Sequence, residues 1–234
     1  MARLVLLRSG QNQWDLEHRF AGWYDADITT QGAGQARRAG EALLAADILP
    51  DVVHTSLQTR AIKTANLTQR TMDRLWIPVR RHWRLNERHH GELTGLTHAE
   101  ATERYGAEQL NRWCNSYDTP PPEISADHSD NPNVDRRYAH LPPDVLPVTE
   151  CLADVVDRVL PYWFEEVIPD LGRFDTVMIA AHGDSLRSLV KHLSDISDDE
   201  IPNLSIPEAQ PLIYQVDGYG RPATDTSVEN RYLR

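Results

Sequence analysis

The sequence predicts an α/β protein with a mostly parallel sheet. Short apolar runs such as Arg3–Leu7 and Thr176–Ala181 stop at polar residues, as buried parallel strands do when they deliver loops to one edge of a sheet. Segments with apolar residues at helical spacing alternate with these runs. Asp51–His54 and Leu212–Val216 predict two further strands. Polar loops at strand ends are where α/β proteins place their chemistry.

The predicted helices follow from apolar spacing and from capping patterns. Small and apolar residues predict a helix over 31–46, and the next helix leaves Arg60 near its N-terminal end, where backbone amides and an arginine can hold an anion together. Thr97–Glu100 and Ser197–Glu200 match the capping box and predict two helix starts. A later helix is predicted by one apolar face, which comprises Leu152, Val155, Val156, Val159 and Leu160.

The length of 234 residues predicts a single domain over residues 1–234. One irregular, proline-rich insertion is expected at about 118–148, since seven prolines lie between Pro120 and Pro147 among Asp, His and Asn. Periodic apolar segments resume at Leu152, so this stretch is interpreted as an excursion over one face and not as a linker between folded halves.

Composition and charge exclude several classes of partner. The chain carries 24 Lys and Arg against 35 Asp and Glu, a formal net charge of −11, which argues against nucleic acid and against anionic membrane surfaces. No apolar run approaches the roughly 20 residues that span a bilayer, and the N-terminus lacks a signal-peptide pattern, so a cytoplasmic location is expected. Cys114 and Cys151 alone suit neither a disulfide framework nor a zinc site.

Four polar residues follow strands or begin helices and could meet at one edge of the sheet: Arg8, Arg60, Glu87 and His182. Arginine offers planar, permanently charged donor pairs that match phosphate oxygens. A carboxylic acid nearby could protonate a leaving oxygen, and a histidine could donate to developing charge. The combination predicts binding of a small anionic metabolite that carries a phosphate or carboxylate.

Each of these side chains also has a purely structural interpretation. Arg8 and Arg60 could tie down loops, Glu87 could pair with Arg8 or with the adjacent Arg88, and His182 could bond to a backbone carbonyl. A second group, His89, His90 and His98, raises the possibility of a metal. Adjacent residues of an extended stretch point in opposite directions, so separate roles are favoured and no metal is predicted.

Several motifs resemble one family, and they occur in that family's order from about residue 3 to residue 216. The family is the bisphosphoglycerate-dependent phosphoglycerate mutases, which belong to the histidine phosphatase superfamily. The motifs are Arg8-Ser9-Gly10, Gln13-Trp14, Arg19–Asp25, Arg60-Ala61-Ile62, Leu85–His89, Pro161-Tyr162-Trp163 and Ala180–Arg187.

The resemblance implies a fold, a site and an assembly. The fold is a three-layer α/β/α sandwich with a phosphate pocket at the carboxyl ends of the strands. In the family, a histidine of the first loop carries the phosphoryl group between positions of glycerate. By position, Glu87 matches the proton donor and acceptor, and His182 lies in the pocket for the transferred phosphate. Family members also assemble into dimers or tetramers, which implies a homodimer or homotetramer. The expected substrate-binding residues are Arg8, Arg60, Gly22, Arg88, Asn115, Gly183 and Asp184.

The chain departs from the family pattern at the nucleophile, because Ser9 stands where the family has its histidine. A serine hydroxyl is almost never ionised near neutral pH without a positioned base, and phosphoserine lacks the leaving group of phosphohistidine. The family's two adjacent arginines are Cys114 and Asn115 here, and its lysine is His98. Other departures from the pattern are Gln11, Asn12, Asp15, Ala21, His90, Asp184, Glu208 and Ala209.

These departures change the charge expected around the pocket. Relative to the family pattern, three cations are lost and three acids are gained around the pocket, while one acid is lost at Gln11. The formal charge around the pocket is therefore about five elementary charges more negative. One unit charge at ~6 Å is worth roughly 3 kcal/mol at an effective dielectric constant of ~20. The change in charge therefore weighs against 2,3-bisphosphoglycerate as the cofactor, and no other cofactor is expected.

Three hypotheses about function follow. The first is a repurposed enzyme that acts on or binds a small phosphorylated or carboxylated metabolite without a phosphohistidine intermediate, with Glu87 and His182 as acid–base and electrostatic groups. The second is a catalytically inactive pseudoenzyme that binds an anion or a protein. The third is a 2,3-bisphosphoglycerate-dependent phosphoglycerate mutase, converting 3-phosphoglycerate to 2-phosphoglycerate, whose nucleophile has been substituted, with Ser9 in its place. The sequence favours the first.

Overall fold

Five strands form one sheet in the order β3-β2-β4-β1-β5. The computed structural model describes residues 1–233. The strands are β1 (Ala2–Arg8), β2 (Val52–Thr55), β3 (Val79–Arg81), β4 (Thr176–Ala181) and β5 (Leu212–Val216). All neighbouring strands are parallel except β5, which is antiparallel to β1. The predicted mostly parallel sheet is thereby confirmed, and its central strands β1 and β4 both end at the same edge, where the loops after Arg8 and Ala181 begin.

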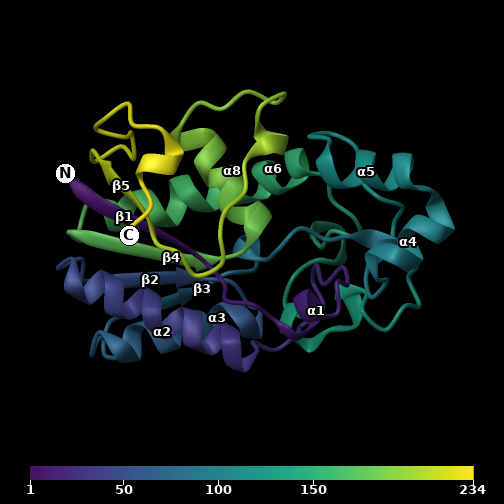
Figure 1. Ribbon diagram of the computed structural model, residues 1–234, viewed down its shortest axis with the longest axis horizontal. Coiled ribbons are helices and arrows are strands. Elements are labelled where there is room, and N and C mark those ends of the chain that lie inside the picture. The colour runs from purple at the N-terminus through teal and green to yellow at the C-terminus, as the bar shows by residue number, and fades with distance from the viewer. Residues whose placement is uncertain (234) are drawn as a thin grey trace.

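Helices cover both faces of this sheet, as Figure 1 shows. One layer consists of α2 (Thr30–Ala45) and α3 (Thr59–Thr71), and the other of α6 (Leu152–Tyr162) and α8 (Gly183–Leu193). A π-helical stretch, Trp163–Val167, and the short helix α7 (Ile168–Leu171) continue from α6. The α/β/α sandwich expected from the resemblance is confirmed.

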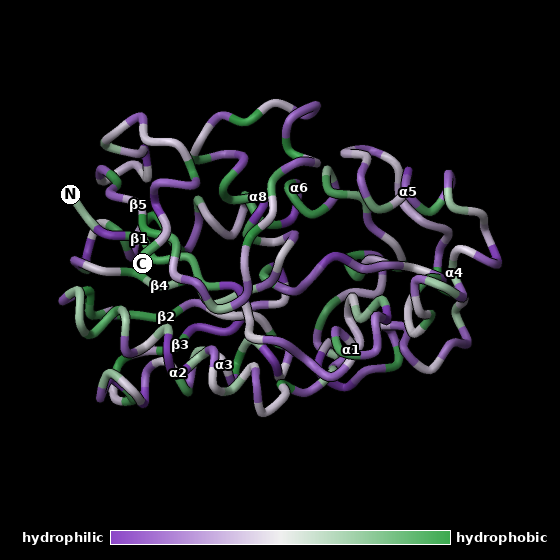
Figure 2. Tube along the Cα trace, in the orientation of Figure 1, coloured by the Kyte–Doolittle hydropathy of each residue, from purple (hydrophilic) through white to green (hydrophobic). Residues whose placement is uncertain are grey.

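The alternation of side chains along β1 explains the two cores. Leu4 and Leu6 pack in the cluster that includes α6 and α8, whereas Val5 and Leu7 pack in the cluster that includes α2 and α3. All four are fully buried, because successive residues of a strand point to opposite faces and both faces are covered. Figure 2 shows the hydrophobic residues concentrated along the central strands and the adjoining helices. This packing holds the strand ends, and the loops they carry, in a fixed position.

Three helices lie beyond one end of the sheet: α1 (Gln13–Leu16), α4 (His98–Tyr105) and α5 (Ala107–Asn115) (Figure 1). The residues between α5 and α6 form the predicted irregular segment. It contains only the 3₁₀ turns Pro132–Val134, Arg136–Tyr138 and Pro143–Val145. The other 3₁₀ turns are Trp83–Leu85, Gly91–Leu93, Ile201–Asn203 and Val228–Asn230.

The two predicted capping boxes have different outcomes. Thr97 caps α4 as predicted, with its hydroxyl accepting the Glu100 N–H and the Glu100 carboxylate accepting the Thr97 N–H. Ser197 and Glu200 form the same reciprocal bonds, but only the 3₁₀ turn Ile201–Asn203 follows, so the predicted helix start is wrong. Pro202 lacks an N–H and Pro207 follows soon after, which leaves no room for an α-helical ladder.

No helix in residues 1–233 combines the length and the apolar character needed to cross a membrane.

Candidate active site

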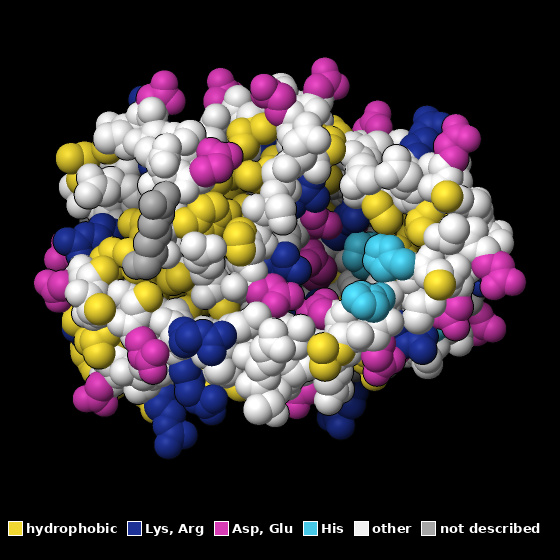
Figure 3. All heavy atoms as spheres, in the orientation of Figure 1, with side chains coloured by type: hydrophobic (Ala, Val, Ile, Leu, Met, Phe, Trp, Pro, Cys, Tyr) yellow, Lys and Arg dark blue, Asp and Glu magenta, His cyan; other side chains and the backbone are white. Residues whose placement is uncertain are grey.

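A cavity of about 280 Å³ opens where β1 ends and brings together six of the predicted site residues, namely Arg8, Ser9, Gly22, Arg60, Glu87 and Arg88. Figure 3 shows the hollow on this face of the molecule, with basic, acidic and histidine side chains around it. The remaining lining residues are Asn12, Asp15, Arg19, Phe20, Ala21, His90, His98 and Cys114. Four arginines against two acids make the lining basic, although the whole chain is acidic.

Arg8 and Ser9 reach the cavity because β1 ends beside β4. The Ser9 N–H donates to the Ala181 carbonyl at 2.8 Å, which continues the parallel ladder one step past the strand. The Arg8 guanidinium donates to the Ile206 carbonyl at 2.8 Å and lies 3.9 Å from the Glu208 carboxylate. Both residues line the cavity, and no side-chain base within residues 1–233 hydrogen-bonds the Ser9 hydroxyl.

Arg60 lies in the first turn of α3 and is almost completely buried. Its guanidinium donates to the carbonyls of Gly22 and Tyr24 at 2.8 and 2.9 Å. Gly22 has a φ of +49°, and a Cβ there would lie 3.1 Å from the Arg88 carbonyl oxygen, so glycine suits this turn. The Gln58 amide donates to the same Gly22 carbonyl at 2.7 Å. Arg60 therefore both ties down the loop and presents its charge to the cavity.

Glu87 does not form the ion pair with Arg8 or Arg88 that was considered as its structural role. Its carboxylate accepts the N–H groups of Gly183 and Asp184, each at 3.0 Å, and that of Arg88 at 2.9 Å. Two of these donors are the first residues of α8, whose positive end favours a negative charge. Burial and the Asp184 carboxylate raise the pKa of Glu87, while the Arg88 N–H, Arg60 and Arg8 oppose that rise.

His182 precedes α8 and is fully buried, with its Nε2 at 2.8 Å from the Ser56 hydroxyl. Its bond is therefore to a side chain and not to the backbone carbonyl considered from the sequence. Burial, together with Arg60, Arg158 and Arg8, lowers the pKa of His182 well below its ordinary value. The imidazole is therefore uncharged at neutral pH, and His182 is not among the residues that line the cavity.

Asp184 binds two arginines at the start of α8. Its carboxylate lies 2.8 Å from Arg88 Nε and 2.7 Å from Arg187 Nη1. Burial alone would raise its pKa, but Arg88 and Arg187 hold the pKa of Asp184 below its ordinary value. Arg88 also donates to the Trp113 carbonyl at 3.3 Å, so the guanidinium connects α8 with α5.

The side of the cavity nearest α4 and α5 carries rings and a thiol in place of cations. Phe20 packs against His98 and His90, with ring centroids 4.2 and 5.3 Å apart. Burial and Arg88 lower the pKa of His90 to about 3, and burial lowers the pKa of His98. Burial also raises the pKa of the Cys114 thiol. These groups are uncharged at neutral pH.

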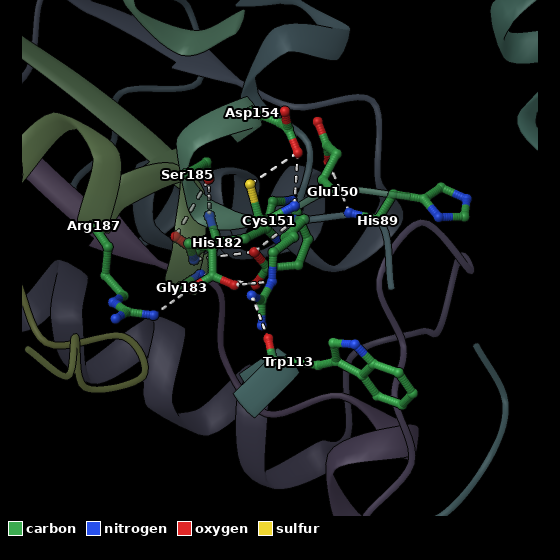
Figure 4. Close-up of polar contacts among 12 residues, drawn as sticks. His89, Trp113, Glu150, Cys151, Asp154, His182, Gly183, Ser185 and Arg187 are labelled. Carbon is green, nitrogen blue, oxygen red and sulfur yellow. Dashed lines mark hydrogen bonds and ion pairs between the residues drawn. The ribbon is translucent and has the colours of Figure 1, made fainter. Parts of the chain in front are cut away.

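Arg158 was not singled out from the sequence, although it holds the segment that carries Glu87 and Arg88. Its guanidinium pairs with both oxygens of the buried Glu150 and donates to the carbonyls of Arg84, Asn86 and Glu87. Glu150 in turn accepts the His89 N–H at 2.8 Å, and Figure 4 shows these two residues side by side. The available signal was an arginine between the apolar residues Val155 and Val159 of one helix.

Four of the ten predicted site residues do not line the cavity, namely Asn115, His182, Gly183 and Asp184. Asn115 lies apart from it. It is the last residue of α5, its side chain is exposed, and its amide donates to Asn111 at 2.7 Å. Gly183 and Asp184 contribute through Glu87 and Arg88 and do not line the cavity. In the described part of the chain, no three His, Cys, Asp or Glu side chains are grouped so as to hold a metal ion.

The arrangement defines a class of protein: an α/β fold with arginines and a carboxyl around a cavity at the strand ends, a set of donors whose chemistry suits a small anion. The model of the histidine phosphatase superfamily (branch 1) matches residues 4–226. The chain therefore belongs to the histidine phosphatase superfamily.

Two curated relatives of the chain carry the same name. A protein of Streptomyces griseus is 53% identical over 220 residues, covering 94% of this chain and 87% of the relative. A protein of Erythrobacter litoralis is 50% identical over 234 residues, covering 100% of this chain and 99% of the relative. Both are named 2,3-bisphosphoglycerate-dependent phosphoglycerate mutase.

Solved structures agree with the fold. Bacillus stearothermophilus YhfR matches with a TM-score of 0.70 and 26% identity, over 97% of this chain and 98% of that one. A structure titled mycobacterial hydrolase 1 matches with a TM-score of 0.70 at 24% identity, over 92% of each chain, and shows the fold alone.

Proposed function

We propose that this protein is a homologue of the phosphoglycerate mutases in which Ser9 replaces the phosphoryl-carrying histidine, and that its cavity binds the phosphoryl group of a phosphoglycerate. The observation that carries the proposal is the basic lining at the strand ends, with Arg8 and Arg60 beside Ser9 and the Glu87 carboxyl. The names of relatives at 50–53% identity favour this function over the repurposed protein expected from the sequence.

The chemistry of residue 9 limits what the unaltered chain can do. A hydroxyl becomes a nucleophile when a neighbouring base takes its proton. Here the buried imidazole of His182 is bonded to Ser56, and the Glu87 carboxylate accepts three backbone N–H groups. We therefore expect the chain to bind phosphoglycerates without relaying the phosphoryl group through Ser9.

The cavity fits one phosphoryl group better than two. Arg8 and Arg60 can face one phosphate, since Arg8 has only the Glu208 carboxylate 3.9 Å away. The cations left for a second, Arg19 and Arg88, have acids of the chain within 2.7 and 2.8 Å. Binding 2,3-bisphosphoglycerate would require breaking such a pair, so we expect this compound to bind weakly. The expectation that the unaltered chain uses no cofactor remains a prediction.

The test is the Ser9→His variant, with Ser9→Ala as the matched control. Supplied with millimolar 2,3-bisphosphoglycerate, Ser9→His should acquire a phosphoryl group on residue 9 and interconvert the phosphoglycerates at least about a hundredfold faster than Ser9→Ala. Intact-protein and peptide mass spectrometry at alkaline pH, which preserves phosphohistidine, measures the phosphorylation of residue 9. A coupled enzyme assay measures the rate at which the phosphoglycerates are interconverted. A folded Ser9→His protein that binds 3-phosphoglycerate yet stays unphosphorylated and inactive would contradict the proposal.

One observation favours a second candidate, the repurposed enzyme. The raised pKa of Glu87 suits a general acid, and the Arg88–Asp184 pair removes a cation that a second anionic group would need. Under this candidate, another phosphorylated or carboxylated metabolite is turned over by the unaltered chain and only bound by Glu87→Gln. A ligand that both proteins bind, and neither converts, would favour the pseudoenzyme.

The remaining expectations from the sequence concern partners and assembly. Four predictions accompany the proposed function. The chain is expected to take a small anionic metabolite and to bind neither nucleic acid nor membrane. It is also expected to act in the cytoplasm and to assemble as a homodimer or homotetramer.

A further inference from the structure

Asp184 is a buried acid next to a cavity whose lining includes four arginines, so its negative charge opposes the basic character of that lining. It does not line the cavity itself. Its two oxygens are taken up by Arg88 at 2.8 Å and by Arg187 at 2.7 Å, and Figure 4 shows Arg187 extended toward the start of α8. Arg187 also donates to the Ile201 carbonyl and is not a lining residue. Asp184 therefore offsets part of the positive charge of Arg88, which is the one of its two arginine partners that lines the cavity.

Without Arg88, the α4–α5 side of the cavity has little positive charge to offer. Arg19 is engaged by Glu17, Glu100 and the Gly95 carbonyl. The rings of Phe20, His90 and His98 and the thiol of Cys114 make up the rest of this side. On the sheet side, Arg8 and Arg60 remain next to Ser9. A ligand held there by its phosphoryl group would direct its other end toward a nearly neutral wall.

We propose that Asp184 is a specificity-determining residue, which reduces the preference of the cavity for ligands with a second anionic group. The proposal rests on the proposed function, namely that the cavity binds a phosphoryl group. In the unaltered chain, Arg88 is held at α8 and α5 and adds almost no attraction for a carboxylate. Replacing Asp184 by an amide of the same shape removes one negative charge and leaves Arg88 free to attract that group.

The experiment compares two ligands of nearly equal size. 3-Phosphoglycerate has a carboxylate where glycerol 3-phosphate has a hydroxymethyl group, so the ratio of their dissociation constants isolates the second charge. Calorimetric titration at low salt should show the ratio shifting at least about tenfold toward 3-phosphoglycerate in Asp184→Asn. Asp27→Asn is the matched control, because Asp27 pairs with the exposed Lys63 outside the cavity and its loss changes the net charge equally. It should leave the ratio within twofold of the unaltered chain.

A double variant keeps the test decisive if Asp184→Asn does not fold. Arg88→Gln combined with Asp184→Asn removes both members of the buried Arg88–Asp184 pair with no change in net charge, and Arg187 keeps the Ile201 carbonyl as its acceptor. Its ratio should match the unaltered chain within about twofold, because the pair contributes no net charge. A tenfold loss of 3-phosphoglycerate preference in the double variant would mean that Arg88 already binds the carboxylate, and would overturn the proposal.

The two proposals fail in different ways. If neither organic phosphate nor inorganic phosphate binds to the unaltered chain or to Asp184→Asn, the proposed function itself is wrong. If both organic phosphates bind but Asp184→Asn shifts the ratio no more than Asp27→Asn does, only the role of Asp184 is wrong. Thermal unfolding of every variant, measured without ligand, establishes that the proteins compared are folded.

Discussion

Arg158→Ala should destabilise the protein by about 3–5 kcal/mol, a large part of the roughly 5–15 kcal/mol that stabilises most domains. The side chain is buried, pairs with both oxygens of Glu150 and donates to three backbone carbonyls. Its removal leaves Glu150, which is 2% exposed, as an uncompensated carboxylate. It also leaves the carbonyls of residues 84, 86 and 87 without this donor. A buried polar group without a hydrogen-bond partner destabilises the folded state by more than a typical hydrogen bond stabilises it.

The same substitution should weaken phosphate binding, because residues 84–89 position Glu87 and Arg88. Urea unfolding measures the stability, and titration with inorganic phosphate measures the binding. Arg158→Lys keeps the charge without the forked geometry and should fall between the unaltered chain and Arg158→Ala. Arg112→Ala, at an exposed position of α5, is the matched control and should change stability by no more than about 0.5 kcal/mol.

Removing Glu150 together with Arg158 separates pairing from packing. The Arg158→Ala, Glu150→Ala double variant should be less destabilised than the sum of the two single variants, since neither charge is left alone in the interior. If Arg158→Ala lost less than about 1 kcal/mol, the role of Arg158 as the support of residues 84–89 would be wrong.

Mild acid should destabilise the protein strongly, because several of its histidines are buried without charge. Burial lowers the pKa of His54 to about 4, with Asp170 opposing that shift and Arg80 adding to it. Burial and Arg158 lower the pKa of His89 to about 3. The pKa of His182 is also well below its ordinary value. In the unfolded chain these histidines become protonated as the pH falls through about 6.5, whereas in the folded chain they stay neutral at that pH.

The sign follows from this difference in bound protons. Because the unfolded state holds more protons between about pH 6.5 and pH 4, stability falls with the pH throughout that window. At pH 5, His54 and His89 each account for a loss of about 2 kcal/mol relative to neutral pH. Glu87 opposes part of this loss, since its raised pKa means that the folded state takes up that proton first. Asp184, whose pKa is lowered, contributes only below its ordinary value of 3.8.

Urea unfolding at pH 7.5, 6 and 5 tests this dependence, with circular dichroism as the readout. His54→Gln should be less stable at neutral pH, because His54 Nδ1 shares a hydrogen bond with the Tyr162 hydroxyl and its Nε2 lies 3.1 Å from Asp170. It should lose about 2 kcal/mol less between pH 7.5 and pH 5. An unfolding free energy that stays constant from pH 7.5 to pH 5 would rule out this account of the buried histidines.

Local patterns predicted much of the fold and several members of the site. Apolar runs located β1, β4 and β5, and strand ends located Arg8 and His182, because such features depend only on neighbours in the chain. The Ser197 prediction was wrong for a local reason, since a proline at residue 202 overrides a capping pattern that does form. Arg158 could not be assigned, because its partners lie 8 to 74 residues away.

Sequence alone predicted an α/β fold in which Arg8, Arg60, Glu87 and His182 could meet at one edge of the sheet, since the order of strands and helices sets which residues end there, and the family resemblance implied the sandwich. The sequence also determined that residue 9 carries a hydroxyl group in place of an imidazole. Only the tertiary structure decided how the charges are distributed. Glu87 lies on the start of α8, Asp184 compensates Arg88, and His182 bonds Ser56. A charge acts according to its distance from its partners, and those distances arise only when distant segments pack together.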